Sequence, residues 1–113
     1  MPNPEVFIKV ICQKMDLEPK IYDTAIYLNQ KAIEKNIING QHAATIAASI
    51  VKLAASLYDV ELPVKQICET SNVCQISLRS LYRQIYPQRF KLIEENNKLC
   101  NDINKIKKNN IQQ

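Results

Sequence analysis

The segment at residues 41–58 constrains the fold most, because as a helix it is apolar around nearly its whole circumference. Outside one narrow stripe, almost every position holds Ala, Ile, Val or Leu. The stripe residues fall at i, i+4, i+7 and i+11: Thr45, Ser49, Lys52 and Ser56. A helix of this pattern is stable only when other helices surround it, and its alanines let their backbones approach closely. A polar stripe that contains Lys52 argues against a membrane span.

Four other segments are predicted to be the surrounding helices. Asn3-Pro4-Glu5 is typical of a helix start, and Pro19 opens a second helix that Gly40 is expected to end. A brief helix opens at Pro63, and after a tight turn at 71–73 another runs from about 75 to 86, where Pro87 stops it. The inward residues expected for the first helix are Val6, Phe7, Val10, Ile11 and Met15, and for the second Tyr22, Ala25, Ile26, Asn29, Ala32 and Ile33. Those expected for the helix that opens at Pro63 are Val64, Ile67 and Cys68, and for the last helix Leu78, Leu81, Tyr82 and Ile85.

Composition supports one all-helical domain and excludes several classes of protein. The chain has 113 residues, 46% of them hydrophobic, and a single glycine, which is few for the turns of a β-rich domain. No apolar run reaches the roughly 18 residues of a membrane span. The cysteines at 12, 68, 74 and 100 lack zinc-site spacing, so we expect reduced, mostly buried thiols and no metal or other cofactor. The alternative is a metal site or a disulfide pair. With one histidine and no glycine-rich phosphate loop, the sequence does not predict an enzyme.

Residues 88–113 form a basic tail, which we separate from the body at 1–87. The tail holds six basic residues and three acids, and so has +3 of the net charge of +4. Leu92, Leu99 and Ile106 lie seven residues apart, which predicts an additional helix with a weak apolar seam. This helix is expected to dock on the body or lie in solvent. The alternative is that it binds a partner or self-associates.

The last two helices of the body, joined by a very short turn, predict a helix-turn-helix. Ile76, Arg79, Ser80 and Arg83 share the outer face of the second helix, and Gln75 and Ser77 flank its N-terminal end. Arginine guanidinium groups, a small hydroxyl and an aliphatic group suit base contacts in a major groove. Lys65 is placed for a phosphate contact. The alternative is an ordinary solvated helix face, and a net charge of +4 is modest for a DNA-binding protein.

Three elements, in this order and spacing, resemble the cyclin-like repeats of transcription factor IIB. They are the alanine-rich GQHAATIAASI at 40–50, PVKQICE at 63–69 followed by NVCQISLR at 72–79, and LYRQIYP at 81–87. The second element is similar to the family's "K-x-I … G-V-x-x-x-T-I-R" pattern, and the third to its "Y-R-x-I-Y-P" ending, which points to the second, C-terminal repeat. The resemblance covers residues 4–87 and implies a five-helix cyclin-like fold.

The resemblance also implies a function and roles for particular residues. In this family the second repeat binds promoter DNA next to the TATA-binding protein, and an RNA polymerase is recruited. Arg79 stands where the family has the arginine that contacts a base. Ile76 stands at the aliphatic position three residues earlier. Ser77 matches the threonine of T-I-R, Lys65 the lysine of K-x-I, and Arg83 the arginine of Y-R, a candidate for a phosphate contact.

The sequence departs from the family pattern at two places. Asn72 replaces the turn glycine, and because asparagine tolerates the left-handed conformation the turn is expected to persist. His42-Ala43 replaces the Ser-Pro that opens the third helix, so we expect His42 to be a helix-start residue. No zinc ribbon or first repeat lies within these residues, which fits either a fragment of a longer factor or a minimal version.

Two further questions stay open at the level of sequence. The runner-up function is a cyclin-type interaction module that regulates a kinase, since it shares the fold. The resemblance implies a nuclear location. The richness in Asn, Ile and Lys is typical of an AT-rich genome, and for a large DNA virus the location would be its transcription site in the host cytoplasm.

Overall fold

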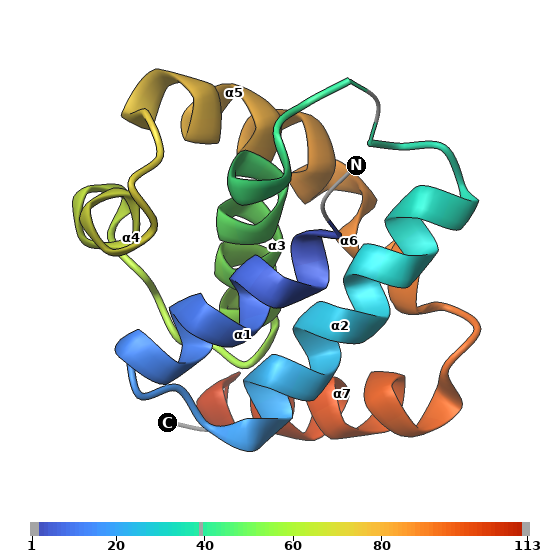
Figure 1. Ribbon diagram of the computed structural model, residues 1–113. Helices are drawn as coiled ribbons and strands as arrows, with labels where there is room; N and C mark the ends of the chain where they lie inside the picture. The colour runs from blue at the N-terminus through green and yellow to red at the C-terminus, as the bar shows by residue number, and fades with distance from the viewer. Residues whose placement is uncertain (1–2, 39, 112–113) are drawn as a thin grey trace.

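The computed structural model describes residues 3–38 and 40–111, with side chains up to Ile106, and every regular element in them is helical. The elements are α1 (Pro4–Lys14), α2 (Pro19–Glu34), α3 (Ala43–Leu57), α4 (Val64–Ser71), α5 (Gln75–Ile85), the 3₁₀ turn η1 (Tyr86–Gln88), α6 (Arg89–Ile93) and α7 (Asn97–Ile111). Figure 1 shows α3 at the centre, with α1, α2, α4 and α5 around it and α7 across one end. The predicted all-α, cyclin-like architecture is confirmed.

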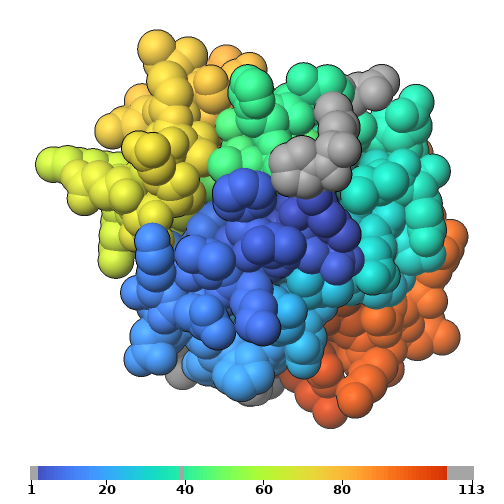
Figure 2. Space-filling model, in the orientation of Figure 1, coloured from blue at the N-terminus to red at the C-terminus, as the bar shows by residue number. Residues whose placement is uncertain are grey.

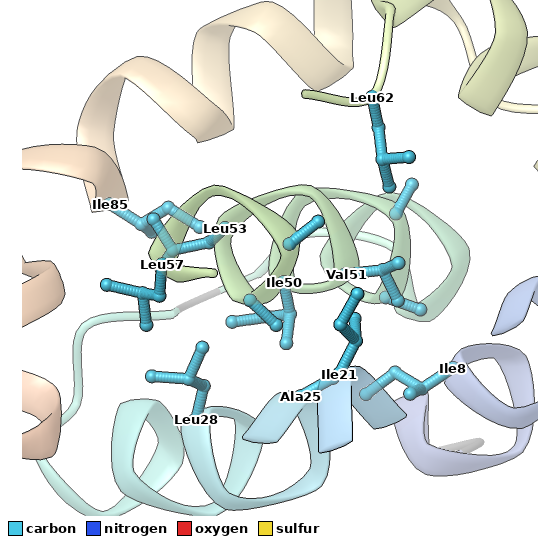
Figure 3. Packing of buried hydrophobic residues seen from close by; sticks show 14 of the residues in the cluster. Ile8, Ile21, Ala25, Leu28, Ile50, Val51, Leu53, Leu57, Leu62 and Ile85 are labelled. Carbon is cyan, nitrogen blue, oxygen red and sulfur yellow. The ribbon is translucent and has the colours of Figure 1, made fainter. Parts of the chain in front are cut away.

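The central helix α3 is enclosed as its composition predicts. Ile50, Val51 and Leu53 are fully buried, and Figure 3 shows side chains of α1, α2, α5 and the connector before α4 converging on this helix. In its polar stripe Thr45 and Ser49 are buried, Lys52 and Ser56 are partly buried, and the side chains of Ser49, Lys52 and Ser56 donate to backbone carbonyls. Ser49 Oγ donates to the carbonyl of Thr45 at 2.9 Å, and Lys52 Nζ donates to the carbonyl of Leu62 at 2.6 Å.

The helix starts predicted at residues 3–5, 19 and 63 are confirmed. Asn3 caps α1, because its Oδ1 accepts a hydrogen bond from the backbone N–H of Glu5 at 3.0 Å. Pro19 is the first residue of α2, and Pro63 is the N-cap of α4. His42 occupies the N-cap position of α3, as expected, although its side chain makes no capping hydrogen bond.

The predicted end of α2 and two of the predicted inner faces are wrong in part. The second helix ends at Glu34 rather than at Gly40, because Asn36 already takes a left-handed conformation (φ 56°). Gly40 takes one as well (φ 76°), but it lies beyond the end of the helix. In α1 the buried residues are Ile8, Ile11 and Cys12, while Val6, Phe7 and Val10 face solvent. This helix has apolar residues on two sides, so spacing alone does not select the buried one.

In α2 the inner face is rotated from the predicted stripe. Ile21, Thr24 and Leu28 are buried together with the predicted Ala25, Asn29 and Ala32, whereas Ile33 is 54% exposed. The face turned toward α3 is therefore centred on Ile21, Ala25 and Leu28, as Figure 3 shows. The inward faces predicted for α4 and α5 are confirmed, with Val64 and Tyr82 half-buried at their edges.

The chain beyond α5 packs against the body. Pro87 ends α5 but lies inside η1, after which α6 begins at once. Leu92, Ile93, Leu99 and Ile103 are buried in the same hydrophobic cluster as α1–α5. Of the alternatives for the tail, its described side chains favour docking on the body, and the domain boundary at 87/88 stays a prediction.

Lys31 of α2 and Lys35, the C-cap of that helix, form ion pairs with the segment between α6 and α7. Lys31 Nζ lies 2.9 Å from a carboxylate oxygen of Glu95, and Lys35 Nζ lies 3.6 Å from one of Glu94. The hydrogen bond from Lys31, and then the charges of Lys31 and Lys35, lower the pKa of Glu95.

Two of the four cysteines are buried, so the expectation of mostly buried thiols holds only in part. All four are free thiols; Cys12 and Cys68 are buried, Cys100 is half-buried and Cys74 is exposed. Burial raises the pKa of Cys12 to about 11. Within the described residues no three His, Cys, Asp or Glu side chains gather as a metal site would require. In the same part of the chain no helix combines the length and apolar character needed to cross a bilayer.

Candidate nucleic-acid interface

The turn between α4 and α5 has only three residues, 72–74. Asn72 takes the left-handed conformation (φ 58°, ψ 42°) that ends α4, and its N–H bonds to the carbonyl of Cys68. The N–H of Val73 bonds to the same carbonyl at 3.2 Å, which is the usual pattern for a glycine-terminated helix. The predicted tight turn is confirmed, and asparagine preserves it in place of glycine.

Helix α5 has one buried and one solvent-facing side. Leu78, Leu81 and Ile85 are buried against the core. Ile76, Arg79, Ser80 and Arg83 are exposed on the outer side, and Ile76 has the highest exposure of the large hydrophobic side chains described, at 78%. Removing so much apolar surface from water would stabilise any complex that covers Ile76.

Gln75 and Ser77, at the start of α5, and Lys65, in the first turn of α4, are also exposed. Cys74 is the N-cap of α5, and the nearby backbone N–H groups of Ser77 and Ile76 lower the pKa of its thiol. The helix N-terminus therefore already favours negative charge at this point. All seven residues that the sequence predicts for DNA contact lie on the solvent side of α4 and α5.

The structure places these residues along two recesses. One recess is lined by Arg79 and Arg83 of α5 together with Val64 of α4. The other is lined by three residues of α5, Ile76, Ser77 and Ser80, and by three residues at the start of α3, Gln41, His42 and Thr45. Lys65 and Gln75 line neither recess. His42, which we expected only to start a helix, thus lies beside the surface predicted to contact DNA. Its position at a helix start gives no indication of this.

The positive charges of Arg79 and Arg83 are not neutralised within the surface, because neither arginine forms an ion pair with any described residue. Arg83 lies in the last turn of α5, where a cation is favourable to the helix dipole. Figure 2 shows the yellow α4–α5 corner on one side of the visible face and the orange-red tail on the opposite side.

The sequence does not predict the aromatic stack that fixes the C-terminal end of α5. The rings of Tyr82 and Tyr86 are stacked with centroids 5.5 Å apart and an interplanar angle of 18°. Lys52 Nζ lies 5.1 Å from the Tyr82 ring centroid, and the Arg89 guanidinium lies 3.9 Å from that of Tyr86. The tyrosines are at i and i+4, a spacing that brings rings together on a helix and could have indicated this stack.

A comparison with protein-family models decides the family. The model described as "Transcription factor TFIIB repeat" matches residues 1–88, which include the whole of α1–α5. The chain belongs to the transcription factor TFIIB repeat family. This confirms the family that the motifs at 40–50, 63–79 and 81–87 resemble.

Relatives with the printed name transcription initiation factor IIB are similar at low identity. The protein of Drosophila virilis is 25% identical over 100 residues, covering 88% of this chain and 34% of the relative. Those of Xenopus laevis and Homo sapiens are 23% identical over 100 residues, covering 88% of this chain and 32% of each relative. The chain thus spans about a third of the length of these relatives.

Proposed function

We propose that this chain is a promoter-binding module of a general transcription initiation factor, and a binding protein rather than an enzyme. In this proposal α4 and α5 dock on duplex DNA, with the outer side of α5 in the major groove. The observation that supports it is the exposed face of α5, on which Ile76, Arg79, Ser80 and Arg83 lie together with no ion pair to the arginines within the described residues.

Each contact residue has a role that follows from its chemistry. Arg79 is central on α5 and can donate two hydrogen bonds to a guanine edge, while Ile76 offers an apolar surface to a thymine methyl group. Gln75, Ser77 and Ser80 add hydrogen-bonding groups near the N-terminal end of the helix, where such helices contact bases. Lys65 and Arg83 are assigned to phosphates, which position the protein without selecting sequence.

Membership in the family supports a proposal for the partners and the location of this function. We propose that the module binds DNA beside the TATA-binding protein and assists recruitment of an RNA polymerase. The corresponding location is the nucleus or, for a virus-encoded protein, the viral transcription site in the host cytoplasm.

The test is a titration of duplex promoter DNA with and without TATA-binding protein, read by fluorescence anisotropy. We expect affinity to fall steeply as salt rises, because phosphate contacts release counterions. Arg79→Ala is expected to weaken binding by about 1–3 kcal/mol at a site with the preferred base and to blur the preference there. Lys98→Ala removes one exposed charge on α7 and serves as the matched control. No affinity for duplex DNA in either condition would reject the proposal, and capture of a kinase instead would favour the cyclin-type alternative.

A further inference from the structure

The start of α3 and the start of α4 lie on opposite flanks of α5. The recess beside the start of α3 has a volume of about 330 Å³, and the α5 residues that line it are Ile76, Ser77, Ser80, Leu81 and Gln84. The recess beside α4 is lined by different residues of α5, namely Arg79, Tyr82 and Arg83. The exposed row of α5 therefore runs between two walls, one at Val64 of α4 and the other at His42.

His42, the single histidine of the sequence, is exposed beside the outer face of α5. Its side chain makes no capping hydrogen bond to α3, and its ring forms no hydrogen bond or ion pair with any residue that the structure describes. Histidine is the side chain whose ordinary titration falls between about pH 5 and 8. A protonated imidazole has a positive charge and donates from both ring nitrogens, whereas the neutral ring donates from one.

No carboxylate competes for this imidazole. His42 also lines a second recess, of about 420 Å³, with Phe7 of α1 and with Asn72, Val73 and Cys74 of the turn before α5. Among the described residues that line the two recesses there is no Asp, Glu, Lys or Arg. Cys74 is their other titratable side chain, and the nearby backbone N–H groups of α5 lower the pKa of its thiol. His42 is thus the only lining residue that can become a cation.

A helix that lies in the major groove has the phosphates of one strand on each side, because the groove is only about 12 Å wide. On the α4 side Lys65 and Arg83 are assigned to phosphates. We propose that His42 binds a phosphate of the other strand in its protonated form, so that the affinity of this chain for duplex DNA rises as the pH falls. The inference rests on the proposed function, which places α5 in the groove. The serine of the family pattern at position 42 has no charge to gain, so the pH response belongs to this chain.

The test is an anisotropy titration of a rhodamine-labelled promoter duplex with the full chain, at about pH 5.5 and about pH 8 and at several salt concentrations. We expect binding to be about tenfold tighter at the lower pH. The slope of log K against log salt should also become steeper by about 0.9, which is the value for one additional phosphate contact. Carboxylates titrate mostly below this pH range and contribute little to the difference. A change in affinity of less than twofold would overturn the proposal.

Three variants assign the pH response to a residue. His42→Gln cannot become charged, and it is expected to have the weaker affinity at both pH values. His42→Lys is charged throughout, and it is expected to have the tighter affinity at both. Cys74→Ser is the matched control and should keep the tenfold response. Both positions are exposed, so circular dichroism is expected to show an unchanged fold. A response that persists in His42→Gln, or one that is lost in Cys74→Ser, would overturn the assignment to His42.

The same titrations separate this inference from the proposed function. If the wild-type chain binds duplex DNA equally well at both pH values, the imidazole contact is overturned while the proposed function stands. If it binds no duplex at either pH, the proposed function fails and the contact fails with it. A phosphate contact should give the same pH response on duplexes that differ at one base pair, because phosphates carry no sequence information. A response confined to one base pair would assign His42 to a base edge and overturn the phosphate contact.

Discussion

Thr24 and Tyr58 join α2 to the end of α3 through a buried hydrogen bond of 2.8 Å between their hydroxyl groups. Either single variant, Thr24→Val or Tyr58→Phe, leaves the other hydroxyl buried and unpaired, which should cost about 1–3 kcal/mol of unfolding free energy. The double variant removes both polar groups, so it should be more stable than the sum of the single effects predicts. Urea unfolding of the four proteins measures this coupling, and simple additivity would show that the bond contributes nothing.

Asn72 should tolerate glycine but not alanine, because its φ of 58° is in the left-handed region. We expect Asn72→Ala to lower the unfolding free energy by about 1 kcal/mol or more, and Asn72→Gly to leave it equal or raise it. Thermal unfolding of the three proteins is the measurement. Equal losses in both variants would mean that the asparagine side chain, rather than the backbone conformation, stabilises the turn.

The tail should unfold together with the body, because Ile103 of α7 is fully buried in the common core. Ile103→Ala is expected to cost about 2–5 kcal/mol, as for other large-to-small core substitutions. Its neighbour Asn104 is exposed, so Asn104→Ala is the control and should stay within about 0.5 kcal/mol of the wild type. A second, low-temperature transition for α7 in calorimetry would contradict a shared core.

Acid should weaken the attachment of the segment before α7, because the pKa of Glu95 is lowered by the Lys31 hydrogen bond and by the charges of Lys31 and Lys35. A carboxyl whose folded pKa lies below its unfolded value of about 4.3 stabilises the fold above that value. This stabilisation is lost as the pH falls through the folded pKa. Glu95→Gln should therefore have a flatter dependence of Tm on pH below about pH 5. Glu69→Gln, which removes an exposed carboxylate outside the ion pairs of the described residues, is the control.

The elements that the sequence predicts well are those where one physical requirement dominates. Residues 41–58 could only be a central helix, and the turn at Asn72 could be placed because few residues accept positive φ. The outer face of α5 follows from strict two-sided spacing.

The errors arise where several solutions satisfy the same pattern. Gly40 and Asn36 can both take a left-handed turn, and the chain uses the earlier one to end α2. Val6 and Phe7 compete with Ile8 for the core, and tertiary packing decides between them. The ion pairs of Lys31 and Lys35 with Glu94 and Glu95 join residues about 60 apart, so no local spacing predicts them.

Arg79 and Arg83 should differ in their response to lysine, although both are exposed arginines one helical turn apart on α5. If Arg79 contacts a base edge with its two-pronged guanidinium, lysine keeps the charge but loses the paired hydrogen bonds, so sequence preference should fall while the salt dependence persists. If Arg83 contacts a phosphate, lysine can replace it as a point charge and both properties should be retained. Anisotropy titrations on duplexes that differ at one base pair, at two salt concentrations, distinguish the roles. If both lysine variants lose the base-pair preference equally, Arg79 and Arg83 do not differ as base and backbone contacts. If Arg79→Lys keeps the preference unchanged, Arg79 does not select the base.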